Sequence, residues 1–466
     1  MQRLIHAVWI AAFSSLVALT PAYASKAFRD AATEGDVARY SRDIVLETGA
    51  RFDKALAYLQ IRNEPDVAAA MILALRFNRD SEARISEALS ALTGHKASGW
   101  FEWMLWQQAN PQIKPHPSYA DLKLEIFARI DPEFLRFLRP AAAQPEQMKI
   151  RLEEITWGGV QVDGIPSLDN PTLIEAAEAD YLLDTDLVFG VEIEGDARAY
   201  PLRIMGWHEM FNETIGGVPV ALAYCTLCGA GILFETQIEG EAKPLIFGSS
   251  GFLYRSNKLM FDRRTGSLWN QFTGQPVTGP LANSGIELKI RPVAITSWAA
   301  WRTANPETRV LSIETGFRRD YGSGVVYRDY FASDDLMFPA LLENTSLKQK
   351  DYVFGIRSVG AAKAWPVTAF AGGKVINDAV GAQPVVLIGD AASRTVRAYD
   401  RGDLSFEAGP DRQTLEGPGG PWRIEEDALV GPDGARLPRV PGHIAYWFAW
   451  DGYLGVESEL YAATHQ

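Results

Sequence analysis

The chain contains an internal duplication, and this feature constrains its fold more than any other in the sequence. Residues 186–222, DLVFGVEIEGDARAYPLRIMGWHEMFNETIGGVPVAL, align without a gap with residues 351–387, DYVFGIRSVGAAKAWPVTAFAGGKVINDAVGAQPVVL, at a shift of 165 positions. Asn212, for example, matches Asn377. A segment that folds twice must bury the same face twice, so the duplication predicts two similar units packed against each other.

Alternation of apolar and polar residues predicts that each copy is built from short β-strands. In the first copy, VFGVEIEGDARAYPL alternates on both sides of a Glu-Gly-Asp turn, which is the pattern of a hairpin. A later match, ITSWAAW at 295–301 with IAYWFAW at 444–450, extends the repeat. We therefore expect a pseudo-symmetric pair of β units, for which a sandwich and a barrel are equally compatible with the pattern.

The residues before the duplication have a different period. Val67, Ala70, Met71 and Ala74 follow the i, i+3, i+4, i+7 spacing of an amphipathic helix, and similar spacing continues through residue 138. The fold class is therefore α+β, with an N-terminal helical region followed by a mostly-β domain built from two internally duplicated units. The expected divisions are a signal peptide at 1–24, a helical domain at 25–138, a linker at 139–148, β repeat unit 1 with the cysteines at 149–345 and β repeat unit 2 without them at 346–458.

The first residues predict export. Arg3 precedes an apolar run at 4–19, and Ala22-Tyr23-Ala24 forms a small-x-small cleavage signal. No later stretch has the roughly 18 apolar residues that span a bilayer, so no membrane span is expected after cleavage. The sequence thus predicts a periplasmic or secreted protein.

The charge balance narrows the classes of partner. Asp and Glu total 58 against 45 Lys and Arg, for a net charge of -13, which argues against nucleic acid as a partner. The helical domain is a candidate surface for a protein partner. The sequence indicates no particular small-molecule substrate.

Cys225 and Cys228 are the two cysteines of the chain, and they lie between two predicted strands, VPVALAY and AGILFE. The duplication provides an internal comparison for them. At a shift of 165 they meet Asp390 and Ser393, so the second copy manages without them. Because positions that serve folding should recur in both copies, the cysteines are candidates for function.

A metal site is the leading hypothesis for this motif, and the sequence therefore predicts an exported metal-binding protein. Two thiolates two residues apart can bind one metal ion, and His208 and His443 would complete a tetrahedral copper or zinc site. Neither histidine recurs in the other copy. A redox pair and a disulfide that staples a binding module use the same two cysteines and remain open as alternatives. Whether a metal site would carry the ion or catalyse with it is also open.

Four further residues are candidates for the surroundings of this site. Glu209 adjoins His208 and is a candidate base or support for a ligand. Tyr224 precedes the first cysteine. Trp269 and Gln271 belong to the segment 247–274, whose density of Ser, Gly, Asn, Arg and aromatic residues is typical of a polar pocket and equally of a turn network.

Several separated motifs resemble one family. The segments RAYPLRIMGWHEMFNETIGGVPVALAYCTLCGAGILFE and FGSSGFLYRSNKLMFDRRTGSLWNQFTGQPVTGP, and WFAW near the end, resemble the bacterial and archaeal "domain of unknown function 3179" over about residues 150–455. The family's usual segment is close to Tyr-Cys-Pro-Leu-Cys-Gly-Ser, so Thr226 stands here in place of proline and Ala230 in place of serine. The resemblance implies that the cysteines and the His208-Glu209 pair are family features, and it implies no activity.

Overall fold

The computed structural model describes residues 34–462, which divide into two compact units. One unit contains the residues up to 100 together with 113–122, and the other contains 101–112 and the residues from 123 onward. The predicted signal peptide lies outside the described residues. No helix within 34–462 is long and apolar enough to cross a membrane.

The first unit is helical, as the sequence predicts. Its α4 is buried along nearly its whole length because every residue from Ala68 to Leu75 is apolar, whereas the flanking helices bury one face. α5 ends at Gly94, whose φ of 74° is the left-handed conformation that commonly closes a helix. The helices of this region are α2 (Glu34–Leu46), α3 (Gly49–Arg62), α4 (Ala68–Phe77) and α5 (Glu82–Thr93).

Three more helices follow in the chain, α6 (Gly99–Ala109), α7 (Tyr119–Ile130) and α8 (Phe134–Ala143), and α8 belongs wholly to the second unit. Phe134 and Phe137 of α8 are buried, and the ring of Phe134 lies 4.4 Å from that of Phe252 in a β-strand of the second unit. Residues 139–148, where the sequence suggests a linker, contain the last turn of α8 with buried Ala141, and then a short 3-10 helix. The apolar face of α8 is what fixes this segment to the sheet.

The duplicated segments form the same strands in the same order, which confirms the repeat, and the helix α9 of the first copy has a 3-10 turn, Val367–Phe370, as its counterpart. Apart from β18, which begins one residue early, each strand of the second copy lies 165 positions after its counterpart. The first copy consists of β4 (Leu187–Ile193), β5 (Asp196–Pro201), α9 (Leu202–His208), β6 (Met210–Ile215), β7 (Val218–Cys225) and β8 (Ala230–Glu235). The second consists of β16 (Tyr352–Ser358), β17 (Ala361–Pro366), β18 (Lys374–Val380), β19 (Gln383–Asp390) and β20 (Thr395–Asp400).

Each copy is completed by strands from further along the chain. β14 (Ala294–Ser297) pairs with β4, as β26 (His443–Tyr446) pairs with β16. β15 (Arg309–Leu311) and β27 (Ser458–Leu460) then pair in parallel with β5 and β17. The helices α10 (Trp298–Ala304) and α12 (Trp447–Leu454) follow β14 and β26, so the tryptophan-rich match noted in the sequence marks equivalent strand–helix units.

Two contacts show why particular residues recur. A Cβ atom built on Gly190 would overlap the indole of Trp301, and one on Gly355 would overlap that of Trp450. Each glycine therefore provides the space in which a helix tryptophan packs on the sheet. Asn212 likewise exchanges two hydrogen bonds of 2.9 Å with the backbone of Phe247, and Asn377 does the same with Phe406 at 2.8 and 2.9 Å.

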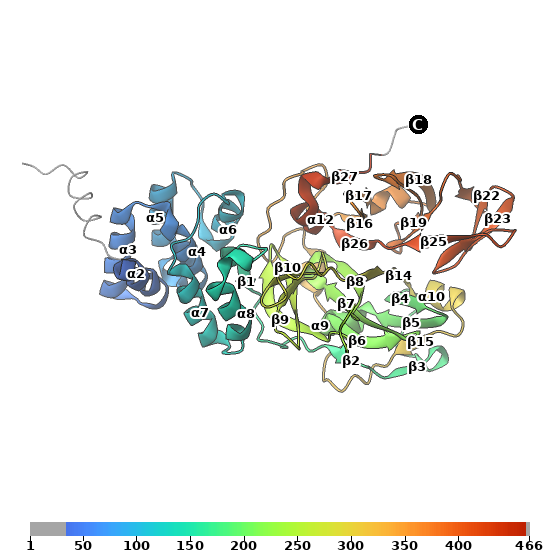
Figure 1. Ribbon diagram of the computed structural model, residues 1–466, viewed down its shortest axis with the longest axis horizontal. Coiled ribbons are helices and arrows are strands. Elements are labelled where there is room, and N and C mark those ends of the chain that lie inside the picture. The colour runs from blue at the N-terminus through green and yellow to red at the C-terminus, as the bar shows by residue number, and fades with distance from the viewer. Residues whose placement is uncertain (1–33, 463–466) are drawn as a thin grey trace, which may run out of the picture. The chain divides into compact units, whose positions relative to one another are not determined.

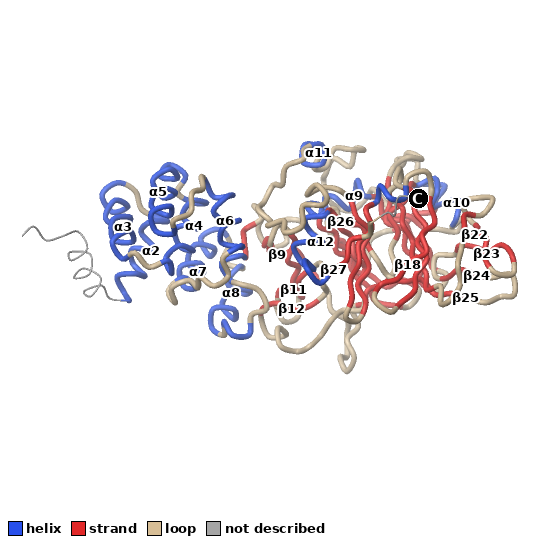
Figure 2. The backbone as a smooth tube through the Cα atoms, turned by 90° about the horizontal axis from the view of Figure 1, so that it is seen from above, coloured by secondary structure: helices blue, strands red, loops and turns tan. Residues whose placement is uncertain are grey.

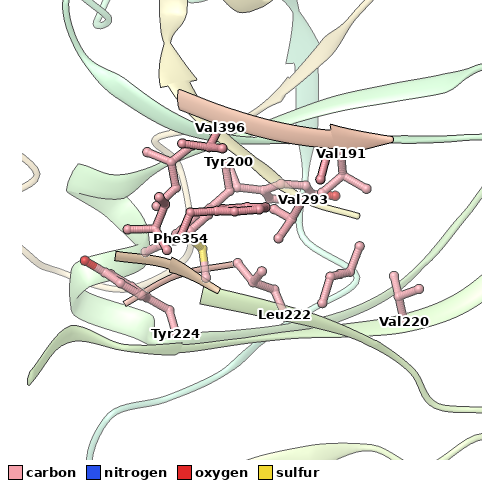
Figure 3. Packing of buried hydrophobic residues seen from close by; sticks show 14 of the residues in the cluster. Val191, Tyr200, Val220, Leu222, Tyr224, Val293, Phe354 and Val396 are labelled. Carbon is pink, nitrogen blue, oxygen red and sulfur yellow. The ribbon is translucent and has the colours of Figure 1, made fainter. Parts of the chain in front are cut away.

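The two copies enclose one core in a nearly closed, barrel-like arrangement. β26 of the second copy contacts β8 of the first (Figure 1). β14 of the first copy contacts β20 of the second. Leu222 and Tyr224 from one copy and Phe354 and Val396 from the other face the same interior (Figure 3). Neither copy buries its apolar face without the other.

A further sheet covers the opposite face of β6–β8, with Met260 and Trp269 packing on Ala223 and Ile232. The strands that carry the cysteines therefore lie between two cores. The covering sheet has the order β1 (Ile155–Trp157), β9 (Phe247–Tyr254), β10 (Asn257–Asp262), β11 (Leu268–Asn270) and β12 (Gln275–Thr278).

The remaining strands extend the edges of these sheets, and Figure 2 shows how the strands of this unit run side by side. The small edge strands are β2 (Leu168–Asp169), β3 (Leu173–Glu175) and β13 (Ile290–Arg291). The second copy's sheet continues through β25 (Arg436–Val440), β24 (Ala428–Val430), β23 (Gly420–Ile424), β22 (Thr414–Gly417) and β21 (Glu407–Ala408).

Candidate functional site

The cysteines occupy a tight turn between two central strands. β7 ends at Cys225, which pairs with Ala230 at the start of β8. Between them Thr226–Cys228 form one 3-10 turn, and Gly229 closes it with a φ of 60°. A Cβ atom on Gly229 would lie 2.9 Å from the ring of Tyr352 in the second copy, so the turn requires glycine for conformation and for space.

Both cysteines are free thiols, and they are buried at 2% and 0% exposure. The Cys228 thiol contacts the carbonyl oxygen of Ser256 at 3.5 Å. Burial raises the pKa of Cys228 well above its usual value, and the neighbouring Cys225 and the negative charge of Glu209 raise it further. The direction of this shift favours the protonated thiol at Cys228.

Glu209 lies next to this pair in an unusual conformation. It follows the last residue of α9 with a φ of 55°, a left-handed region that non-glycine residues enter at a cost of about 1–2 kcal/mol. Its backbone connects α9 to the end of β7, just before the cysteine turn. Its amide donates to the carbonyl of Met205 at 2.7 Å, and its carbonyl accepts from the amide of Tyr224 at 2.8 Å. Backbone strain of this kind persists where the surrounding structure holds the residue in place, and it is common at functional sites.

Three donors surround the Glu209 carboxylate, which is almost fully buried. Lys258, from β10 of the covering sheet, lies 3.1 Å from one oxygen. Thr226 donates to the other oxygen at 2.8 Å, and Tyr327 donates to that same oxygen at 3.3 Å. The Lys258 side chain is itself only 4% exposed, so a complete ion pair is buried beside the dithiol.

Thr226 has a specific part in this arrangement. Its hydroxyl makes the 2.8 Å hydrogen bond that joins the cysteine turn to Glu209. A residue without a side-chain donor at this position would lose that contact.

A long connection covers the cysteines. We call residues 312–351, which join β15 to β16, the strap. Its short helix α11 (Arg328–Ala332) lies outside the strands (Figure 2). The hydroxyls of three strap tyrosines point to the site: Tyr321 bonds His208 at 2.6 Å, Tyr327 bonds Glu209, and Tyr330 bonds the carbonyl of Leu227 at 2.6 Å.

The structure does not bring His208 to the cysteines as a ligand. Its Nδ1 is 2.9 Å from the carbonyl of Pro166, and its Nε2 is 2.6 Å from the Tyr321 hydroxyl. Both ring nitrogens are thus engaged, and burial lowers the pKa of the ring. Among the described residues, no group of three or more His, Cys, Asp and Glu side chains converges in the way that a metal site requires.

His443 lies in an aromatic environment on β26. Its ring is 4.9 Å from Phe272 and 5.6 Å from Trp450. Burial, and then the charge of Arg357, lower its pKa to about 3. Its Nε2 atom has no hydrogen-bond partner within the described part of the chain. The ring is therefore a buried, neutral imidazole.

The other predicted residues divide between the site and the core. Gln271 supports the cysteine turn, because its amide nitrogen donates to Ala223 at 2.8 Å and to Ala230 at 3.2 Å. Tyr224 contacts Phe189 in the shared core, and burial raises the pKa of its phenol. Trp269 is a core residue whose indole nitrogen donates to Asp262 at 3.0 Å.

Sequence reasoning missed Lys258, Tyr327 and Tyr330. Lys258 belongs to the polar-rich segment 247–274, so the signal for its neighbourhood was present, but nothing distinguished this lysine from an exposed one. The strap tyrosines lie about a hundred residues after the cysteines and follow no recognisable motif.

Residues 162–456 match the family described as Protein of unknown function (DUF3179). The chain belongs to the DUF3179 family. Comparison with curated proteins found no match, and comparison with solved structures found none. The DUF3179 match spans both copies, the cysteine turn and the strap, and it begins after the helices α2–α8.

Proposed function

We propose that this DUF3179 protein is a thiol–disulfide redox protein whose centre is Cys225 and Cys228. The observation that carries the proposal is the pair of buried, free thiols in one turn, which the Thr226 hydroxyl joins to the buried carboxylate of Glu209. Two adjacent thiols can exchange two electrons by forming and breaking one S–S bond. A carboxylate bonded to the same turn can take and return the proton that this chemistry moves.

The surroundings suggest a division of roles. The Ser256 carbonyl engages the Cys228 thiol at 3.5 Å, so we assign the first attack to Cys225 and the closing of the disulfide to Cys228. In this scheme Glu209 accepts the proton that Cys225 releases. Lys258 and Thr226 hold the carboxylate in place through their hydrogen bonds.

The signal-like N-terminal segment supports action outside the cytoplasm, where a dithiol is more readily oxidised. The second copy supports one centre per chain, because it has Asp390 and Ser393 at the equivalent positions.

A copper or zinc site is the second candidate, and the adjacency of two soft thiols favours it. It requires further ligands beyond the cysteines. His208 would have to give up its contacts with Tyr321 and Pro166 to become one.

One experiment separates the two candidates. The mature chain is purified, analysed for copper and zinc, and equilibrated in buffers of graded redox potential before alkylation and intact-mass measurement. We expect a two-electron transition between dithiol and disulfide that Cys225→Ser abolishes and that the copy-two control Ser393→Ala preserves. About one equivalent of metal, lost in Cys225→Ser, would instead support the metal site. A chain that neither forms the disulfide nor binds metal would refute both.

A further inference from the structure

Four buried polar atoms next to the cysteine turn have no hydrogen-bond partner within the described residues. They are the hydroxyl of Ser256, both amide atoms of Asn257 and the amide oxygen of Gln271. All three residues are at most 2% exposed. Buried polar groups are normally satisfied, so open ones on residues at a reactive turn are candidates to bind a polar molecule.

Two of these residues contact the cysteine turn, and the third is their neighbour in the chain. The carbonyl oxygen of Ser256 accepts a hydrogen bond from the Cys228 thiol, and Asn257 follows Ser256. Gln271 bonds the carbonyls of Ala223 and Ala230, which flank the turn. Because carbonyls only accept hydrogen bonds, these contacts fix the Gln271 nitrogen and leave its oxygen as the open acceptor.

The open atoms define the chemistry of the ligand. Asn257 offers one donor and one acceptor, Ser256 offers a hydroxyl that is both, and Gln271 offers an acceptor. The nearby buried cation, Lys258, is already paired with Glu209. The site thus suits a small neutral molecule that both donates and accepts hydrogen bonds. The burial of both cysteines under the strap favours a small molecule over a protein disulfide.

We propose that this polar site binds a hydroperoxide, hydrogen peroxide or a small organic one, as the oxidant of the dithiol. The inference rests on the redox function proposed above. The Cys225 thiolate attacks one peroxide oxygen and the O–O bond breaks, which leaves a sulfenic acid on Cys225 and releases an alcohol or water. Cys228 then attacks the Cys225 sulfur, the S–S bond forms and water leaves. Two thiols and one hydroperoxide give one disulfide, one alcohol or water, and one further water.

The polar residues would assist both ends of the peroxide. The donors of Asn257 and Ser256 would stabilise the oxygen that leaves as its negative charge develops. The acceptors of Asn257 and Gln271 would orient the peroxide O–H. Loss of such a bond to developing charge typically slows a step by about tenfold or more.

The test measures single-turnover oxidation of the reduced, full-length mature chain by stopped-flow tryptophan fluorescence and quenched intact-mass analysis. The probes are hydrogen peroxide, tert-butyl hydroperoxide and, as a disulfide reagent, oxidised glutathione. We expect both peroxides to form the Cys225–Cys228 disulfide at least about tenfold faster than glutathione disulfide, and Asn257→Leu to slow only the peroxide reaction by about tenfold. Ser256→Ala, a smaller change, provides a second variant should Asn257→Leu fail to fold.

Thr278→Val is the matched control, because it removes a buried unpartnered hydroxyl elsewhere in the covering sheet and should leave both rates unchanged. Equal rates for peroxide and glutathione disulfide, or equal slowing of both in Asn257→Leu and Ser256→Ala, would overturn the peroxide site and leave the redox function standing. Failure of every oxidant to form the disulfide would overturn the redox function itself.

Discussion

Replacing Lys258 by methionine tests whether the buried ion pair organises the site. The change keeps most of the volume and the apolar stem of the side chain, and it removes the ammonium that lies 3.1 Å from Glu209. The two side chains are 4% and 7% exposed, so the carboxylate would lose its counter-charge with almost no access to water. Breaking a buried pair by removing one partner costs about 3–5 kcal/mol.

The remaining bonds from Thr226 and Tyr327 still support the carboxylate. We therefore expect a loss near the lower end, about 3 kcal/mol, and a recovery of at least about half of it when Glu209→Gln is combined with Lys258→Met. The matched control is Arg302→Met, which breaks an ion pair whose side chains are 45% and 66% exposed. That change should cost less than about 1 kcal/mol.

Urea unfolding at neutral pH, followed by tryptophan fluorescence with a check on the m-value, measures these differences. A loss in Lys258→Met no greater than that in Arg302→Met would refute the reasoning. So would additive effects in the double variant, because additivity would mean that the two charges do not interact.

Three further predictions follow from the described contacts. Burial, and then a neighbouring guanidinium charge, lower the pKa of His443 from 6.5 to about 3, so the unfolded chain takes up the proton first. The stability that this difference contributes is present above pH 6.5 and is lost as the pH falls toward 3. His443→Gln should therefore lose less stability than the wild type between pH 7 and pH 4, as measured by urea titration. Equal losses in the two proteins would contradict the burial of the ring. Gly355→Ala should destabilise the protein by about 1–3 kcal/mol or more, because the added methyl group overlaps an indole. Gly452→Ala is the control, because the nearest atom to its added methyl group is 3.8 Å away. Thermal unfolding should show a loss of stability in the first variant and none in the second. Thr226→Val should lower stability by about 1 kcal/mol and slow dithiol oxidation, while Thr226→Ser retains both; indistinguishable valine and serine variants would argue against the hydroxyl's role.

The duplicated framework could be predicted from the sequence because its positions serve packing, and packing recurs. The shift of 165 places Gly190 on Gly355 and Asn212 on Asn377, and each pair performs the same task in the structure. The choice between sandwich and barrel could not be predicted, because it depends on which strands of one copy contact the other.

The cysteine turn, and Glu209 as a residue near it, could be predicted from the sequence, because Glu209 lies fewer than twenty residues before the cysteines. The metal hypothesis stays a prediction, and it depends on where the ring nitrogens of His208 and His443 lie, which spacing in the sequence does not determine. His208 lies one residue before Glu209, yet its ring bonds Tyr321, more than a hundred residues later. Lys258 reaches the site from another sheet, and no spacing rule marks such a contact.

The contact between β26 and β8 has a consequence for how the chain acquires its fold. The strand that leaves the cysteine turn gains this neighbour only when a segment about two hundred residues later arrives, and long-range pairings of this kind slow folding. During that interval the thiols would be exposed to oxidants and to thiols of other chains. The cysteines of the first copy are buried only after the last strands of the chain have been synthesised. A truncation near residue 440 would remove β26 and leave the cysteines exposed and reactive.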